Sequence, residues 1–129
     1  MGEARRVLVT GHRGYLGSCL VDRLVRRGLV VHGLDAELVP IGLLGPVSPV
    51  ALEHVADIRD VSAEVFDGVD AVVHLAALSN DPMGDLDHAV TEDINHRGAV
   101  RIARLAREHG VARFVFASSC SVYGASDGT

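Results

Sequence analysis

The chain has 129 residues, of which 48% are hydrophobic, and carries a formal net charge of −5; its twelve basic residues are all arginine. This length fits one domain with a buried core, and the composition is that of a globular chain rather than a disordered one. An acidic balance without a long basic run makes nucleic acid an unexpected partner. The longest apolar stretch, residues 38–52, is interrupted by prolines and glycines, so no membrane span is expected.

Cysteine and histidine usage indicates the compartment and argues against a metal site. Cys19 and Cys120 form no ligand cluster, and no signal segment precedes the first apolar run. We therefore expect a reduced, cytoplasmic protein. The seven histidines are scattered without paired ligand spacing, so no metal is expected. His74, inside an apolar run, is expected to be a hydrogen-bonded core residue.

Short apolar runs alternate with helical patterns along the chain. The sequence predicts five strands, at residues 6–10, 30–34, 54–56, 71–75 and 114–117. It also predicts a helix from Tyr15 that stops at Gly28, a short helix at 62–66 and a helix at 91–109 that stops at Gly110. This alternation predicts an α/β fold with a parallel sheet and right-handed crossovers. Ligands of such sheets bind at the carboxyl ends of the strands.

A glycine-rich loop, Thr10-Gly11-His12-Arg13-Gly14-Tyr15-Leu16-Gly17, joins the first strand to the first helix. Gly11 allows a sharp turn, Gly14 lets backbone N–H groups approach a pyrophosphate, and Gly17 lets the helix pack close to the strand. The helix N-terminus then faces an anion. The spacing is one residue longer than the common dinucleotide fingerprint, and a bare structural turn is the alternative. The loop residues expected to contact a cofactor are Gly11, Arg13, Gly14, Tyr15, Leu16 and Gly17.

Two acidic residues at later strand ends fit the rest of a dinucleotide. Asp35, eighteen residues beyond Gly17, stands where a carboxylate accepts hydrogen bonds from the adenosine ribose. Its charge would repel a 2′-phosphate, which favours NAD over NADP. Asp57 is suited to accept from the adenine amino group, with Ile58 covering the ring. The alternatives are a solvated acid in a turn for Asp35 and a helix-initiating residue for Asp57.

Together these residues resemble the N-terminal part of the extended short-chain dehydrogenase/reductases, the family of NAD-dependent nucleotide-sugar epimerases and dehydratases. The resemblance covers essentially the whole chain. Its motifs are the three loop glycines, Asp35, Asp57-Ile58-Arg59-Asp60, His74-Leu75-Ala76-Ala77, Asp93-Ile94-Asn95 and Phe116-Ala117-Ser118-Ser119-Cys120-Ser121-Val122-Tyr123-Gly124. It implies a Rossmann-like doubly wound parallel sheet, with residues 1–129 forming an NAD-binding domain that has five of the family's six strands.

The resemblance also implies roles for individual residues. The segment 75–77 would lie along the cofactor, Asn95 would support the region near the nicotinamide ribose, and Ser118 would lie beside the nicotinamide. Ser119 matches the family's active-site serine or threonine, which binds the reacting sugar hydroxyl. For Asn95 the alternative is a hydrogen bond within its own helix.

The acid/base pair of the family is missing from these 129 residues. It is a Tyr-x-x-x-Lys motif, in which the lysine lowers the pKa of the tyrosine. Tyr15 and Tyr123 are followed at that offset by Cys19 and Asp127, and the sequence contains no lysine. We therefore expect the chain to be inactive alone, and the gene to continue past Thr129 into this motif and a substrate-binding part.

For the parent enzyme, the resemblance implies hydride transfer between a carbon of a nucleoside-diphosphate sugar and NAD; a homodimer is plausible because relatives often dimerise. Two alternatives stay open. The first is NADP as the cofactor: His12-Arg13 is similar to the loop of GDP-fucose synthase, an NADPH user, and Arg13 could reach a cofactor phosphate. A non-catalytic redox-sensing or interaction module that binds a dinucleotide is the other, although Ser119 and the missing sixth strand favour the enzyme.

Overall fold

The computed structural model describes residues 5–37, 48–78 and 87–119. Cys120, Tyr123 and the rest of the motif after Ser119 lie outside these residues. The strands are β1 (Arg6–Thr10), β2 (Val30–Asp35), β3 (Leu52–Val55), β4 (Ala71–His74) and β5 (Arg113–Phe116). The helices are α1 (Tyr15–Arg26), the 3₁₀ helix η1 (Ala63–Phe66), α2 (His88–Glu92), the π-helical turn η2 (Asp93–Gly98) and α3 (Ala99–Glu108).

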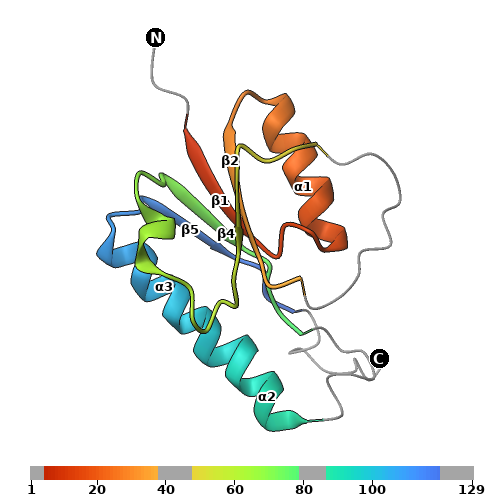
Figure 1. Cartoon of the computed structure of the whole chain (residues 1–129), viewed down its shortest axis with the longest axis vertical. Helices are drawn as coiled ribbons and strands as arrows, with labels where there is room; N and C mark the ends of the chain where they lie inside the picture. The colour runs from red at the N-terminus through yellow and green to blue at the C-terminus, as the bar shows by residue number, and fades with distance from the viewer. Residues whose placement is uncertain (1–4, 38–47, 79–86, 120–129) are drawn as a thin grey trace, which may run out of the picture.

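All four strand pairs are parallel, and the strand order across the sheet is β3-β2-β1-β4-β5. The order reverses direction between β1 and β4, the point at which doubly wound sheets bind their ligands. Helix α1 covers one face of the sheet, while α2, η2 and α3 form one continuous rod on the other (Figure 1). The predicted doubly wound α/β sheet is confirmed, with each predicted strand present and only small shifts at the strand ends.

The long helix begins earlier than the sequence pattern predicts. It starts at His88 rather than near Thr91, because Asp87 caps it: its Oδ1 accepts from the backbone N–H groups of Ala89 and Val90 at 2.9 and 3.3 Å. The π-helical turn within it was not predicted. Such turns are rare and are found frequently at functional sites.

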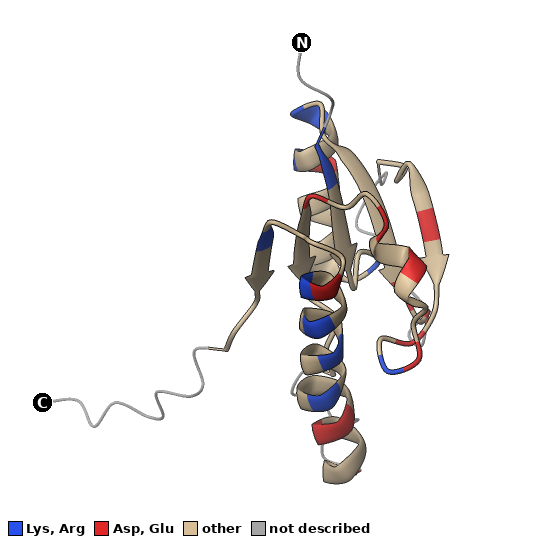
Figure 2. Cartoon of the chain, turned by 90° about the vertical axis from the view of Figure 1, so that its left-hand side faces the viewer, with Lys and Arg blue, Asp and Glu red and all other residues tan. Residues whose placement is uncertain are grey.

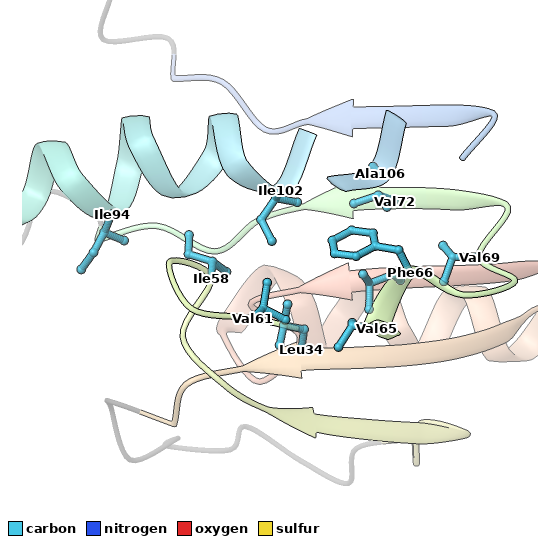
Figure 3. Packing of buried hydrophobic residues seen from close by; sticks show 11 residues of the cluster. Leu34, Ile58, Val61, Val65, Phe66, Val69, Val72, Ile94, Ile102 and Ala106 are labelled. Carbon is cyan, nitrogen blue, oxygen red and sulfur yellow. The ribbon is translucent and has the colours of Figure 1, made fainter. Parts of the chain in front are cut away.

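The core forms two layers because alternate side chains of each strand point to opposite faces of the sheet. On the α3 face, Phe66 of η1 is fully buried in one cluster with Val72 of β4 and Ile102 of α3 (Figure 3). Leu8 of β1 belongs to the same cluster. On the α1 face, a second cluster is formed by Val7, Val9, Val21 and Val31. Fully burying each large aliphatic or aromatic side chain contributes roughly 1.5–3 kcal/mol. These two clusters pack the helices against the two faces of the sheet.

Arginine positions recur along the long helix, where Figure 2 shows a row of blue segments. They belong to Arg97, Arg101, Arg104 and Arg107. Among them, Arg101 donates from Nη2 to the backbone carbonyl of Val61 at 3.0 Å, which ties the helix to the segment before η1. Within the described residues, no helix is long and apolar enough to cross a membrane.

Candidate dinucleotide site

The glycine-rich loop turns at the carboxyl end of β1. The Gly11 N–H donates to the Leu34 carbonyl at 2.8 Å, which ties the turn to the end of β2. Gly11 has φ of +70°, a conformation that side chains disfavour. A Cβ atom on Gly17 would lie 2.1 Å from the Gly11 carbonyl oxygen, so no side chain fits there. A Cβ atom on Gly14 would meet only that oxygen, at 3.3 Å, so the outer side of the loop at Gly14 stays open.

The N-terminus of α1 is arranged to receive an anion. The first N–H groups of an α-helix have no acceptor within the helix, and here Gly14 provides no side-chain cap and the first turn holds no acidic residue. Neither a cap side chain nor an acidic residue of this first turn therefore compensates the positive end of the helix dipole. Tyr15 and Leu16, at this turn, are 69% and 65% exposed. Two large, exposed side chains beside the start of a helix suit a ligand that combines phosphates with rings.

Asp35, the last residue of β2, connects the loop to the turn after β2. Its Oδ2 accepts from the Arg13 backbone N–H at 3.2 Å, and its Oδ1 accepts from the Glu37 N–H at 2.9 Å. Glu37 lies in the left-handed region with φ of +55°, and the bond from Asp35 holds it there. Each carboxylate oxygen can accept more than one hydrogen bond, so Asp35 retains capacity for ribose hydroxyls.

Arg13 is surrounded by carboxylates that sequence patterns did not point to. Its Nε donates to Glu53 Oε1 at 2.8 Å, and its Nη1 pairs with Glu37. The same Glu53 oxygen lies 2.9 Å from His12 Nε2. These two hydrogen bonds lower the pKa of Glu53 to about 2, and the bond from Arg13 has the larger effect. The bond to Glu53 likewise raises the pKa of Arg13.

Sequence analysis missed Glu53 because the third strand was predicted to begin at His54. The pairing of Gly33 with Glu53 in the β2–β3 register is the feature that brings it to the loop. A Cβ atom on Gly33 would lie 2.5 Å from the His12 ring, so the glycine makes room for that ring between loop and sheet. A glycine inside a predicted strand is the sequence signal that could have indicated a close approach here.

Asp57 is held by Arg59. Arg59 donates from Nη2 to Asp57 Oδ2 at 2.7 Å and from Nε to Oδ1 at 3.0 Å, and its Nη1 reaches Asp93 Oδ2 at 3.1 Å. The Arg59 hydrogen bond is the main reason that the pKa of Asp57 is lowered. The carboxylate is thus ionised and oriented, and Arg59 links the segment after β3 to the π-helical turn through Asp93. Its contact with an adenine amino group stays a prediction.

The predicted role of the Ile58 side chain needs correction. Its side chain is 5% exposed and packs in the core beside Ile94 and Ile102 (Figure 3), and a Cβ atom on Gly98 would lie 2.7 Å from its Cδ1. It therefore cannot cover an adenine ring with that side chain. The physical reason is the turn after Asp57, which directs the next apolar residue inward. Only the backbone of Ile58 remains for a ligand.

Thr10 and His74 join the ends of β1 and β4. The Thr10 hydroxyl accepts from the backbone N–H groups of Leu75 and Ala76, each at 3.2 Å, so its own proton points to His74 Nδ1 at 2.7 Å. His74 is therefore a neutral imidazole that carries its proton on Nε2. Burial lowers the pKa of His74 to about 4. The expected hydrogen-bonded core histidine is found, and it shapes the segment that begins with Leu75, Ala76 and Ala77.

Asn95 lies in η2 and reaches across to the segment after β4. Its Oδ1 accepts from the Leu78 N–H and its Nδ2 donates to the Leu78 carbonyl, both at 2.8 Å. The alternative of a hydrogen bond within its own helix is thus wrong. Asn95 fixes the backbone of Leu78, which supports the segment next to the predicted nicotinamide region. Direct contact of Asn95 with a cofactor stays a prediction.

Ser118 and Ser119 follow the carboxyl end of β5, and both are exposed. Just before them, the Ala117 N–H donates to the His74 carbonyl at 3.2 Å, which continues the pairing of β5 with β4. The two serines therefore follow a strand that ends at the same edge of the sheet as the strands before the glycine loop, Asp35 and Asp57. No three metal-binding side chains are grouped anywhere in residues 5–37, 48–78 and 87–119.

This arrangement defines a class of protein. A parallel sheet of order 3-2-1-4-5, a glycine-rich turn after the first strand and a carboxylate at the end of the second are the features of a Rossmann-type dinucleotide-binding domain. The family model described as "NAD dependent epimerase/dehydratase family" matches residues 7–129. The chain belongs to this family, and the resemblance stated from the sequence is confirmed.

Known proteins of this family cover nearly all of the chain. A putative UDP-glucose 4-epimerase of Methanocaldococcus jannaschii is 34% identical over 92% of this chain and 39% of its own length. UDP-glucose 4-epimerase 2 of Oryza sativa subsp. japonica is 36% identical over 95% of this chain and 33% of its own. The solved structure of MoeE5 in complex with UDP-glucose and NAD has a TM-score of 0.82 at 31% identity, covering 95% of this chain and 39% of that one. The chain thus spans well under half the length of these proteins.

Proposed function

We propose that this chain is the NAD-binding portion of an NAD-dependent oxidoreductase of the epimerase/dehydratase type that acts on a nucleoside-diphosphate sugar. The observation that carries the proposal is the junction at Asp35. There one carboxylate lies against the glycine-rich loop, 3.2 Å from the Arg13 N–H, at the edge of the sheet where ligands bind. The proposed phosphate site and the proposed ribose site would thereby be adjacent, as a dinucleotide requires.

The residues present fit NAD. The open side of the loop at Gly14 and the uncapped start of α1 would hold the pyrophosphate, and Asp35 would accept from the adenosine ribose. The carboxylate of Asp57 would accept from the adenine amino group. Leu75, Ala76 and Ala77 would lie along the rest of the cofactor, whose nicotinamide supplies a hydride acceptor when bound. The negative charge of Asp35 favours NAD over NADP.

We propose Ser119 as the residue that binds the reacting hydroxyl of the sugar, with Ser118 beside the nicotinamide. Nucleoside-diphosphate sugars are the proposed substrates because the MoeE5 structure, similar over 95% of this chain, contains UDP-glucose together with NAD. The Tyr-x-x-x-Lys pair is not among these 129 residues. We therefore propose that the chain alone binds the cofactor without turning substrate over, and that residues beyond Thr129 in the parent protein supply the acid/base pair.

A thermal melt tests cofactor binding. A ligand that binds only the folded state stabilises it in proportion to the logarithm of its concentration, so NAD at millimolar concentration should raise the melting temperature. AMP, which lacks the pyrophosphate and nicotinamide, serves as the weaker control. Mixing the chain with NAD and UDP-sugars tests the second part: no NADH absorbance is expected, and its appearance would show that the chain is active alone.

A non-catalytic dinucleotide-binding module is the second candidate, favoured by the absence of lysine from the sequence. The coding sequence after codon 129 discriminates the two. A Tyr-x-x-x-Lys motif there supports the enzyme, whereas a natural stop codon supports the module. For either one we propose a cytoplasmic location, with reduced cysteines, and a homodimer, which sedimentation of the purified protein would detect.

A further inference from the structure

Four charged side chains lie together beside the proposed ribose site. Asp35, Glu37 and Glu53 contribute three negative charges and Arg13 one positive charge. Arg13 is paired through Nε with Glu53 and through Nη1 with Glu37, and its backbone N–H donates to Asp35. The guanidinium is thus already satisfied by two carboxylates of this chain, and the group as a whole retains an excess of negative charge.

Glu53 is held in place from a second direction. His12, whose ring is 5% exposed, must carry its proton on Nε2 because a carboxylate only accepts, and it donates to the same Glu53 oxygen at 2.9 Å. Gly33 leaves the space that the ring occupies. β3 and the buried His12 imidazole thus both hold Glu53 in place. Glu53, through its ion pair, in turn positions Arg13.

A 2′-phosphate on the adenosine ribose would add up to two negative charges at neutral pH. For Arg13 to pair with this phosphate, the guanidinium would have to break an ion pair with Glu37 or Glu53. The negative charge of that glutamate would then be left unpaired beside the phosphate. Bidentate pairing with Arg is the usual means of binding a phosphate, so an occupied Arg13 withholds the one basic group of this cluster from NADP.

We propose that Glu53 and Glu37 are specificity-determining positioning residues: they hold Arg13 in ion pairs and thereby make the site reject a 2′-phosphate. This inference rests on the proposed NAD site. It assigns the choice of cofactor to a three-residue arrangement as well as to Asp35. Neutralising the two glutamates should weaken the ion pairs that hold Arg13 and leave its guanidinium available to pair with the 2′-phosphate.

The test measures dissociation constants for NAD and NADP with Glu53→Gln, Glu37→Gln and the double variant, all of which keep side-chain shape. Partly exposed ion pairs contribute up to about 1 kcal/mol, so each substitution should tighten NADP binding by about 5-fold and leave the NAD constant nearly unchanged. Adding Arg13→Leu to the double variant should remove the gain. Glu108→Gln, an exposed carboxylate at the far end of α3, is the control of equal charge change and should alter neither constant.

The outcomes separate the inference from the function on which it rests. If the wild-type chain binds NAD but the glutamate variants leave the NADP constant unchanged, or if the gain persists without Arg13, the inference is wrong and the NAD site stands. If the folded wild-type chain binds neither cofactor, the proposed function fails and the inference with it. Glu37→Gln keeps the test decisive should Glu53→Gln disturb His12, because Glu37 is on an exposed turn.

Discussion

The hydroxyl of Thr10 donates a hydrogen bond to Nδ1 of His74 across 2.7 Å, between the last residues of two neighbouring parallel strands. The same oxygen accepts from the two N–H groups that follow His74. One buried side chain thus determines the tautomer of the histidine and the path of the chain leaving β4. That path leads into the segment proposed to lie along the cofactor.

Replacing Thr10 with valine should destabilise the fold strongly. The change keeps the shape but leaves His74 Nδ1 and the Ala76 N–H without their partner, whereas the Leu75 N–H keeps the Thr10 carbonyl at 3.1 Å. Each unsatisfied buried group costs about 1–3 kcal/mol. We expect a loss of about 3 kcal/mol in the free energy of unfolding, measured with urea. Thr10→Ser retains the hydroxyl and is the matched control. Equal stability of the valine and serine variants would contradict the assigned hydrogen bonds.

Stability should fall in acid because of His74. Its folded pKa of about 4 lies below the unfolded value of 6.5, so the unfolded chain binds the proton more tightly. The stabilisation is complete above pH 6.5 and is lost as the pH falls toward 4. About 2–3 kcal/mol should disappear between pH 7 and 4.5.

Urea unfolding across this pH range, with His74→Asn as the comparison, measures that contribution. His32 and His54 also have lowered pKa values, chiefly through burial, so a smaller slope of the same sign should remain in the variant. An unchanged slope in His74→Asn would show that His74 does not account for the acid sensitivity.

Substituting alanine for Asn95 should loosen the segment after β4. The variant loses both hydrogen bonds to the Leu78 backbone, for an expected cost of about 1–3 kcal/mol. Hydrogen exchange of the Leu78 amide should accelerate more than exchange in β1. His96→Ala, an exposed neighbour in the same π-helical turn, is the control and should change stability by less than about 0.5 kcal/mol. Similar effects of the two variants would rule out a specific role for Asn95.

Alanine substitutions at Gly14 and Gly17 should distinguish the effect of the loop on folding from its effect on NAD binding. Gly17→Ala places a Cβ atom 2.1 Å from the Gly11 carbonyl oxygen, so a loss of at least about 3 kcal/mol in unfolding free energy is expected. Gly14→Ala meets only a 3.3 Å contact and has φ of −69°, so it should fold. If the pyrophosphate lies against Gly14, this second variant should nevertheless bind NAD about 10-fold more weakly; unchanged binding would place the pyrophosphate elsewhere.

Sequence patterns predicted the sheet because its signals are local. The apolar runs that become β1 and β4 are bounded by small or polar residues. Each glycine of the loop can be given a physical reason from its place in the motif. Asp35 could be placed by its distance from Gly17 along the chain. All of these depend on neighbouring residues, and the parallel order then brings the strand ends to one edge.

The contacts that sequence patterns missed depend on register and on the direction of turns. Glu53 reaches Arg13 only because β3 pairs with β2 so that Glu53 lies beside Gly33. Ile58 was placed against adenine, but the turn after Asp57 directs its side chain into the core. A shift of one residue in a strand reverses which face a side chain occupies, and no local pattern in this chain determined that register.

Calorimetric titration of NAD into the purified chain, alongside its Asp35→Asn variant, tests whether the chain binds NAD and whether the Asp35 carboxylate takes part. We expect one NAD bound per chain, and binding about 10-fold weaker in Asp35→Asn, since charge-assisted hydrogen bonds contribute about 1.5–3 kcal/mol. A cooperatively folded chain that takes up no NAD at millimolar concentration, or that binds it equally well without the Asp35 carboxylate, would show that the proposed NAD site is wrong.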